Sequence, residues 1–201
     1  MRPLSRTLST ISLAVCLVST SLLLLIPLGV TAEDVELVPT SDVSAGFDVV
    51  YPADGVHYTK VDDGASHDSA TTYCRAVTNG DTDIYGLEDM SEPSGNYDLD
   101  VTIHIVCQDA GTGTAYFDAG VYISSTCYVG VNDQAAPNTW TEYTYTWETN
   151  PNTAAEGTYT GINGMGVCVA VADAAPDVDV TSVYIVVTIT YAATWAPTTH
   201  P

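Results

Sequence analysis

Basic residues are what this chain has least of. It contains 4 Lys and Arg against 25 Asp and Glu, which gives a formal net charge of -21 over 201 residues. Nucleic-acid binders hold phosphates with Lys and Arg, and anionic lipid surfaces attract the same side chains, so the deficit argues against both kinds of partner. With 46% hydrophobic residues and 13 Tyr, the chain can still bury a core, which excludes an acidic disordered tail.

Catalytic signatures are also missing. The sequence contains no Gly-x-Ser-x-Gly, no His-Glu-x-x-His and no glycine-rich phosphate loop. Carboxylates are so numerous that a pair at glycosidase separation carries no information. His104 lies inside an alternating apolar segment and is interpreted as structural. We therefore expect a protein that is not an enzyme.

The N-terminus has the order typical of a secretory signal peptide: a basic start, an apolar run and a small-residue cleavage pattern. Arg2 and Arg6 form the basic start, and Ala32 closes the cleavage pattern. We expect residues 1–32 to be removed and the rest to be secreted and extracellular, at the cell surface. The apolar run is just long enough to cross a bilayer, so an uncleaved membrane anchor is the alternative.

Cysteine usage agrees with export. Beyond the expected cut four cysteines remain, and an even count in an exported chain predicts two disulfides. The four candidates are Cys74, Cys107, Cys127 and Cys168. Three pairings are open, and we favour Cys107 with Cys168 because both lie in central apolar runs. No Cys-x-x-Cys or paired Cys/His spacing is present, so the sequence predicts no zinc site.

Beyond residue 32 the hydrophobic pattern has period two, as in half-buried strands. The clearest strands are expected over residues 101–107, 116–123, 139–147, 167–172 and 180–191, with weaker ones near 35–38, 56–61, 71–77 and 83–87. The turn signal Ala110-Gly111-Thr112-Gly113 predicts that the first two form an antiparallel hairpin.

Seven to nine short strands without intervening helices predict an all-β fold. We expect an antiparallel jelly-roll β-sandwich of two packed sheets over residues 33–191, preceded by the signal helix and followed by a tail over residues 192–201.

Several segments carry a resemblance to a known type of domain. They are Leu37-Val-Pro39, Val61-Asp-Asp-Gly64 with His67 to Tyr73, the stretch Trp140 to Thr153, Ile162-Asn-Gly-Met-Gly166, and Val180 to Thr188. Together they resemble exported jelly-roll domains of surface, adhesin-like and tail-fibre proteins, which are similar in architecture to carbohydrate-binding modules. The resemblance implies a surface binding role. It departs at Gly157-Thr158, where such domains carry a Trp-Thr pair.

Acidic turns are candidate calcium sites, because calcium takes six to eight oxygen ligands. The best cluster is Asp62, Asp63 and Asp68, with Gly64 permitting a tight loop. Weaker clusters are Asp81 with Asp83, and Asp173 with Asp177 and Asp179. A merely solvated acidic loop is the alternative, and His57 and His67 beside the first cluster are interpreted as surface residues.

Aromatic rings can stack on the apolar face of a sugar. Tyr143, Tyr145 and Trp147 share one strand face, which we interpret as core packing in preference to a sugar platform. Exposed ligand candidates are Tyr128, Trp140 and Trp195.

Three functions follow from these patterns. The leading one is a non-catalytic binding or adhesion module that recognises glycan or another surface polymer. The second is a structural subunit that binds copies of itself in a filament or layer, with the segment Glu33–Val50 donated to a neighbour's sheet edge. The third is a glycan-degrading enzyme.

Overall fold

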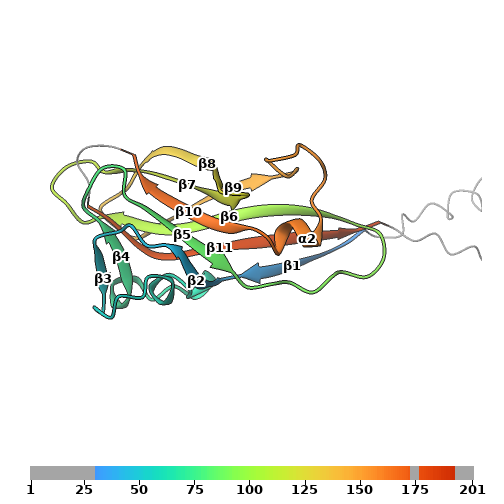
Figure 1. Ribbon diagram of the computed structural model, residues 1–201, viewed down its shortest axis with the longest axis horizontal. Coiled ribbons are helices and arrows are strands. Elements are labelled where there is room, and N and C mark those ends of the chain that lie inside the picture. The colour runs from blue at the N-terminus through green and yellow to red at the C-terminus, as the bar shows by residue number, and fades with distance from the viewer. Residues whose placement is uncertain (1–29, 173–176, 193–201) are drawn as a thin grey trace, which may run out of the picture. The chain divides into compact units, whose positions relative to one another are not determined.

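The computed structural model describes residues 30–172 and 177–192, and strands dominate both ranges (Figure 1). The strands are β1 (Thr31–Leu37), β2 (Pro39–Ser44), β3 (Val49–Tyr51), β4 (Tyr73–Ala76), β5 (Thr82–Leu87), β6 (Tyr97–Asp109), β7 (Tyr116–Ile123), β8 (Thr126–Ala135), β9 (Thr141–Trp147), β10 (Gly166–Val171) and β11 (Val178–Tyr191). Short 3-10 turns cover Tyr58–Lys60, Gly64–Ser66 and Ser69–Thr71, and the helix α2 covers Tyr159–Ile162.

The strands form two packed antiparallel sheets. One has the order β3-β4-β11-β6-β9, with β1 also paired to β11, and the other has the order β2-β5-β10-β7-β8. Because the chain passes repeatedly from one sheet to the other, most neighbours in a sheet are not consecutive in sequence. The expected antiparallel β-sandwich is confirmed.

The longest strand, β11, shows why these residues form a sandwich. Val183, Ile185 and Val187 are fully buried and alternate with residues on the outer face. On the neighbouring β6, Ile103 and Ile105 alternate in the same way and are also fully buried. Side chains of a strand point to opposite faces in turn, so one face of each strand enters the core.

Two local predictions are wrong. Strands β6 and β7 do not form a hairpin, because they lie in different sheets and pair with other strands. The turn between them is held by Asp109, whose carboxylate accepts hydrogen bonds from the N–H groups of Gly111 and Ala115. Residues 56–61 form no strand but a 3-10 turn.

The three 3-10 turns lie within residues 58–71, which we call the 3-10 segment. This segment fills a gap beside β11. Strand β4 pairs with one end of β11 and β1 with the other, which leaves residues 181–184 without either partner. The backbone N–H of Val183 donates to the carbonyl of Val61 at 3.0 Å, and the hydroxyl of Ser182 donates to the carbonyl of Gly64 at 2.9 Å. The turns therefore satisfy the free edge of β11 in place of a strand.

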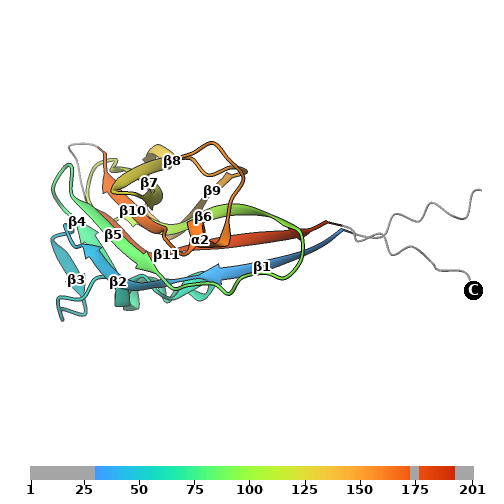
Figure 2. The same ribbon diagram turned by 45° about the vertical axis from the view of Figure 1, so that its right-hand side comes forward.

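The N-terminal segment is bound within its own chain. Strand β1 runs antiparallel beside β11, and β2 pairs with β5 in the other sheet (Figure 2). The segment Glu33–Val50 thus has strand partners within its own chain, and its donation to a neighbour's sheet edge stays a prediction. Thr31 and Ala32, which precede the expected cleavage point, pair with Tyr191 and Thr190. Residues 1–29 of the expected signal segment lie outside the described residues, as does the tail beyond residue 192.

The disulfide prediction is wrong in number and in pairing, because the described residues contain one bond where two were expected. Cys168 on β10 is bonded to Cys127 on β8, with a Cα–Cα distance of 6.2 Å, while Cys74 and Cys107 are buried free thiols. Strand β8 was not anticipated from the sequence. It approaches β7 closely at Gly120, where a Cβ atom would lie 2.2 Å from the carbonyl oxygen of Tyr128.

No helix in the described ranges is long and apolar enough to cross a membrane.

The Cys127–Cys168 bond closes a loop of 41 residues. Restricting such a loop in the unfolded chain stabilises the fold by about 3–4 kcal/mol. We expect Cys127→Ser to lower the free energy of unfolding in urea by about that amount. Peptide mapping without reduction should yield a cross-linked pair containing Cys127 and Cys168; a cross-link to Cys107 would contradict the assignment.

Candidate functional site

Three aromatic rings lie together on the outer face of one sheet, and we call them the aromatic surface: Tyr51, Tyr73 and Trp140. Tyr51 on β3 is the register partner of Tyr73 on β4, and their rings stack with centroids 5.2 Å apart at 19°. Trp140, just before β9, is tilted against Tyr73 with a centroid distance of 6.5 Å. Tyr51 is 49% exposed, and the other two are half-buried. The sheet thus presents an apolar patch that is partly open to solvent.

A charged pair lies beside these rings. The guanidinium of Arg75 lies 5.4 Å from the centroid of the Tyr73 ring, and it donates to both carboxylate oxygens of Asp179. Asp179 is 1% exposed and also accepts from the side-chain amide of Gln108 at 3.3 Å. The bidentate pair fixes the guanidinium next to the ring, so that polar donors and an apolar face are adjacent.

The predicted ligand residues are not brought together. The hydroxyl of half-buried Tyr128 donates to Asn152 at 2.6 Å, beyond the end of β9 at Trp147, whereas Trp140 precedes the beginning of β9. At about 3.3 Å per residue, the seven residues of β9 separate Tyr128 from Trp140 by about 20 Å. Trp195 lies outside the described residues. Tyr51 and Tyr73 were missed, because the pairing of β3 with β4 brings Tyr51 to Tyr73, and the strand order β4-β11-β6-β9 brings Tyr73 to Trp140.

Strand β9 carries a second aromatic group, which we call the aromatic edge: Tyr145 and Trp147. Core packing was expected for Tyr143, Tyr145 and Trp147; Tyr143 and Trp147 do pack against the core, but Tyr145 is 43% exposed. The two edge rings meet at 64° and lie over Gly130 on β8, where a Cβ atom would approach Tyr145 to 2.4 Å. A shallow hollow beside them is lined by Tyr145, Thr146, Trp147, Glu148, Thr149 and Pro151.

The predicted calcium residues lie in the 3-10 segment. A carboxylate oxygen of Asp63 accepts from the N–H of Asp68 at 3.2 Å, and Asp68 accepts from the N–H and hydroxyl of Thr72. Burial raises the pKa of Asp62 and Asp63, and the neighbouring charge of Asp68 adds to both rises. These carboxylates brace the loop through hydrogen bonds, and calcium binding there stays a prediction.

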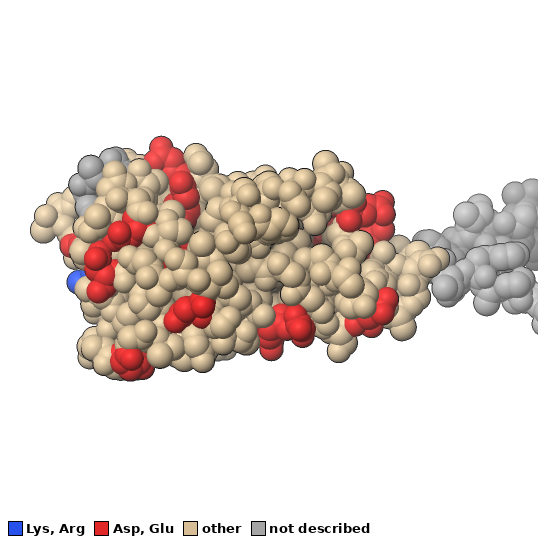
Figure 3. All heavy atoms as spheres, in the orientation of Figure 1, with Lys and Arg blue, Asp and Glu red and all other residues tan. Residues whose placement is uncertain are grey.

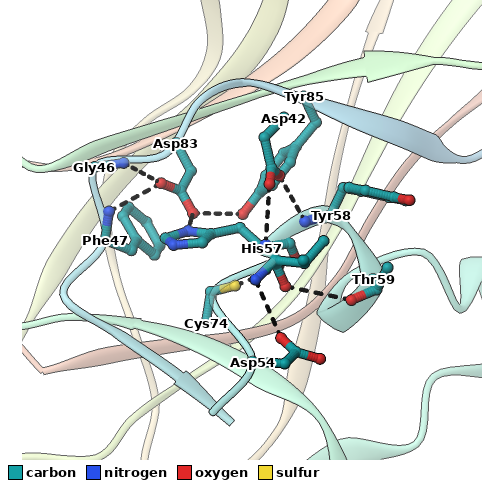
Figure 4. Close-up of polar contacts among 11 residues, drawn as sticks. Asp42, Gly46, Phe47, Asp54, His57, Tyr58, Thr59, Cys74, Asp83 and Tyr85 are labelled. Carbon is teal, nitrogen blue, oxygen red and sulfur yellow. Dashed lines mark hydrogen bonds and ion pairs between the residues drawn. The ribbon is translucent and has the colours of Figure 1, made fainter. Parts of the chain in front are cut away.

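The structure contains a buried polar group that the sequence did not reveal, the inter-sheet cluster of His57, Cys74, Asp83 and Tyr85 (Figure 4). Cys74 enters the core from β4, and Asp83 and Tyr85 enter it from β5 in the facing sheet. All three are fully buried, and His57 is 7% exposed. The interpretation of His57 as a surface residue is therefore wrong.

Asp83 organises the cluster. One of its carboxylate oxygens accepts from the N–H groups of Gly46 and Phe47 at 2.6 and 2.9 Å. The other accepts from the hydroxyl of Tyr85 and is bonded to Nδ1 of His57, both at 2.7 Å (Figure 4). A carboxylate in a protein core is costly unless its hydrogen bonds are satisfied, and here they are.

The chemistry of this cluster is not that of an exposed nucleophile. Burial raises the pKa of the Cys74 thiol, the charge of Asp83 adds to the rise, and the thiol donates to the carbonyl of His57. Burial also raises the pKa of Tyr85 well above its ordinary value. A buried neutral thiol is inert toward substrates, although its sulfur remains a potential metal ligand.

A second His–carboxylate pair lies on the outer face. Nδ1 of His104 is 2.8 Å from Glu142, the ring stacks on Tyr184 at 4.5 Å, and the Tyr184 hydroxyl donates to the same Glu142 oxygen. His104 is thus held by packing and hydrogen bonds, in line with a structural role.

Removing the Tyr85 hydroxyl tests the inter-sheet cluster. Tyr85→Phe leaves a buried carboxylate with one hydrogen bond fewer, so we expect the free energy of unfolding to fall by about 1–3 kcal/mol. Tyr145→Phe is the matched control, because that ring is 43% exposed, and its effect should stay within about 0.5 kcal/mol. Equal effects in urea denaturation would contradict the assigned role of Asp83.

The pair of Glu142 and His104 predicts a pH dependence. Burial raises the pKa of Glu142, but hydrogen bonds from His104 and Tyr184 outweigh it, and the pKa falls below 4.5. Such a carboxylate stabilises the fold above its unfolded pKa, and the contribution is lost as the pH falls through the folded pKa. Because Glu142 is solvent-screened, Glu142→Gln should cost about 0.5 kcal/mol near neutral pH.

Thermal unfolding followed from neutral pH into the acid range measures this difference. The gap between wild type and Glu142→Gln should narrow as the pH falls below the ordinary glutamate pKa of about 4.3. Glu148→Gln changes an exposed carboxylate with no hydrogen bond among the described residues. Its melting temperature should equal that of the wild type both near neutral pH and in acid. A gap that widens in acid would overturn the assignment.

No protein-family model matches this chain, and no curated protein matches it. Among solved structures, it is similar to a family 35 carbohydrate-binding module from Cellvibrio japonicus, with 12% identity and a TM-score of 0.38, over 82% of this chain and 100% of that one. A family 35 carbohydrate-binding module from an environmental isolate has 18% identity and a TM-score of 0.38, over 79% of this chain and 98% of that one. The cleaved adhesin domain of Lys-gingipain from Porphyromonas gingivalis has 15% identity and a TM-score of 0.35, over 77% of this chain and 99% of that one. Similarity at this level carries no argument about ligand or activity, and the fold stands on the strand order given above.

Proposed function

We propose that this protein is an exported, non-catalytic binding module that holds a glycan on the aromatic surface of Tyr51, Tyr73 and Trp140. The observation that carries the proposal is the stacked Tyr51–Tyr73 pair, of which Tyr51 is half-exposed, beside a third ring on the same face. The signal-like N-terminus and the Cys127–Cys168 bond support export, because disulfides persist in oxidising compartments.

The chemistry of the surface fits a sugar. The apolar face of a pyranose packs on an aromatic ring, while its hydroxyl groups need polar partners at the rim. Arg75, held beside Tyr73, supplies N–H donors, and Gln108 lies next to the same carboxylate. An extended polymer passing over Tyr51, Tyr73 and Trp140 would meet rings and donors together.

Charge narrows the class of glycan. Asp and Glu are spread over the visible face, with almost no Lys or Arg (Figure 3). The formal net charge of -21 repels polyanions, and Arg75 is already neutralised by Asp179. We therefore expect a neutral polysaccharide in preference to one rich in uronic acid or sulfate.

Calcium is part of the proposal as a brace and not as a ligand of the sugar. The candidate cluster of Asp62, Asp63 and Asp68 lies in the segment that leads into β4, which carries Tyr73. Ion binding there would stiffen the support of the aromatic surface.

A glycan array, run with and without a chelator, tests the ligand. We expect binding to a neutral polysaccharide, with at least a tenfold weaker affinity in Tyr51→Ala, a loss of about 1.4 kcal/mol. Because Tyr51 is 49% exposed, the variant should keep its thermal stability. A chelator effect on affinity would support the calcium brace.

The matched control is Tyr145→Ala, which removes a similarly exposed ring at the aromatic edge. Its affinity should equal that of the wild type. Loss of binding in this variant alone would move the ligand to the β8–β9 side and overturn the proposed site. Absence of binding to every glycan at high protein concentration would remove the ligand itself.

A further inference from the structure

The inter-sheet cluster brings together three different metal-ligand types. A ring nitrogen of His57, the sulfur of Cys74 and a carboxylate oxygen of Asp83 all lie within 4.8 Å of one another. Imidazole nitrogen, thiolate sulfur and carboxylate oxygen are the donors that bind zinc and similar borderline ions. In the described ranges this is the one group of His, Cys, Asp or Glu that meets that spacing.

The three donors come from three elements. His57 precedes the first 3-10 turn, Cys74 lies on β4 in one sheet, and Asp83 lies on β5 in the other. Only the packing of the two sheets joins them, which explains why no sequence spacing indicated a zinc site. The donors are also fixed, because Cys74 and Asp83 extend from strands and are fully buried.

Asp83 is oriented as a metal-binding carboxylate needs to be. One oxygen is held by the backbone N–H groups of Gly46 and Phe47, and the other faces Nδ1 of His57 and the hydroxyl of Tyr85. Partners of this kind orient the ligands in known metal sites. The oxygen shared with His57 and Tyr85 can turn to an ion while the backbone bonds persist.

A second carboxylate lies beside the cluster. The carboxylate of Asp42 accepts from the N–H groups of His57 and Tyr58, next to Asp83. The nearby amine of Lys60 is bonded to Asp54 at 2.6 Å and so is already paired. A divalent cation bound by one thiolate, one carboxylate and one neutral imidazole makes the buried site electrically neutral, which removes the cost of an unbalanced buried charge.

We propose that the inter-sheet cluster binds a divalent ion of the zinc type, with His57, Cys74 and Asp83 as its ligands. On binding, the thiol of Cys74 releases its proton to solvent, and the ion takes the place of the hydrogen bond between His57 and Asp83. The ion then links β4 of one sheet to β5 of the other. This proposal is independent of glycan binding.

The chain offers a matched control for Cys74. Cys107 is an equally buried free thiol, and both cysteines are register partners of Val180, on opposite sides of β11. Burial alone raises the pKa of Cys107, and no His or carboxylate of the described residues is hydrogen-bonded to it. Cys74→Ser and Cys107→Ser therefore remove similar thiols, of which one belongs to the proposed site.

Titration with cobalt(II), a spectroscopic substitute for zinc, tests the proposal. Wild type and Cys107→Ser should each show thiolate-to-cobalt absorption that saturates at one equivalent and disappears when zinc is added. Cys74→Ser should lack it, and His57→Gln should weaken cobalt binding at least tenfold. Near-ultraviolet circular dichroism confirms that each variant is folded.

A second readout uses the unmodified protein. Zinc should raise the melting temperature of wild type and of Cys107→Ser, because an ion that binds only the folded chain stabilises it. If the wild type shows no thiolate absorption and no zinc-dependent shift, the proposal fails. It fails equally if Cys74→Ser behaves as the wild type does, since the ion would then be held elsewhere.

Discussion

The pairing of β11 with strands on both of its edges, while its inner face is buried against the other sheet, is the constraint on which the rest of the structure depends. This strand pairs along its length with β6, and its Val183, Ile185 and Val187 are fully buried between the sheets. Its free edge is completed by three different devices: β4 at one end, β1 at the other and the 3-10 segment between them. Because β11 holds these elements, it also fixes where β3 and β4 display their outer side chains.

The two faces of β4 show how one short strand serves two purposes. Tyr73 and Arg75 point outward into the aromatic surface and its charged pair, while Cys74 and Ala76 point into the core. The inter-sheet cluster therefore lies directly behind the aromatic surface. Strand β4 thus contributes side chains both to the polar core and to the exposed rings.

Much of the fold was predictable, because period-two burial is a property of each strand alone. The alternation over β6, β9 and β11 predicted strands and a sandwich. The hairpin and disulfide predictions failed because they depended on which strands become neighbours. A glycine turn signal cannot say whether the chain returns in the same sheet, and an unrecognised β8 hid the partner of Cys168.

The candidate site was less predictable for the same reason. Trp140 was identified as an exposed ligand residue, but Tyr73 reaches it only through the strand order of the sheet, and Tyr51 only through the pairing of β3 with β4. His57 appeared polar and solvated beside an acidic turn, whereas the facing sheet supplies a buried partner in Asp83. Tyr145 was grouped with its inward neighbours, yet it lies on an edge strand that leaves its ring partly uncovered.

The indole N–H signals of the tryptophans give the most direct test of where a glycan binds. Trp140 belongs to the aromatic surface and Trp147 to the aromatic edge, at opposite ends of β9. In a nuclear magnetic resonance titration with an oligosaccharide, the account predicts that the Trp140 signal moves to saturation while that of Trp147 stays in place. Movement of Trp147 with a stationary Trp140 would contradict it.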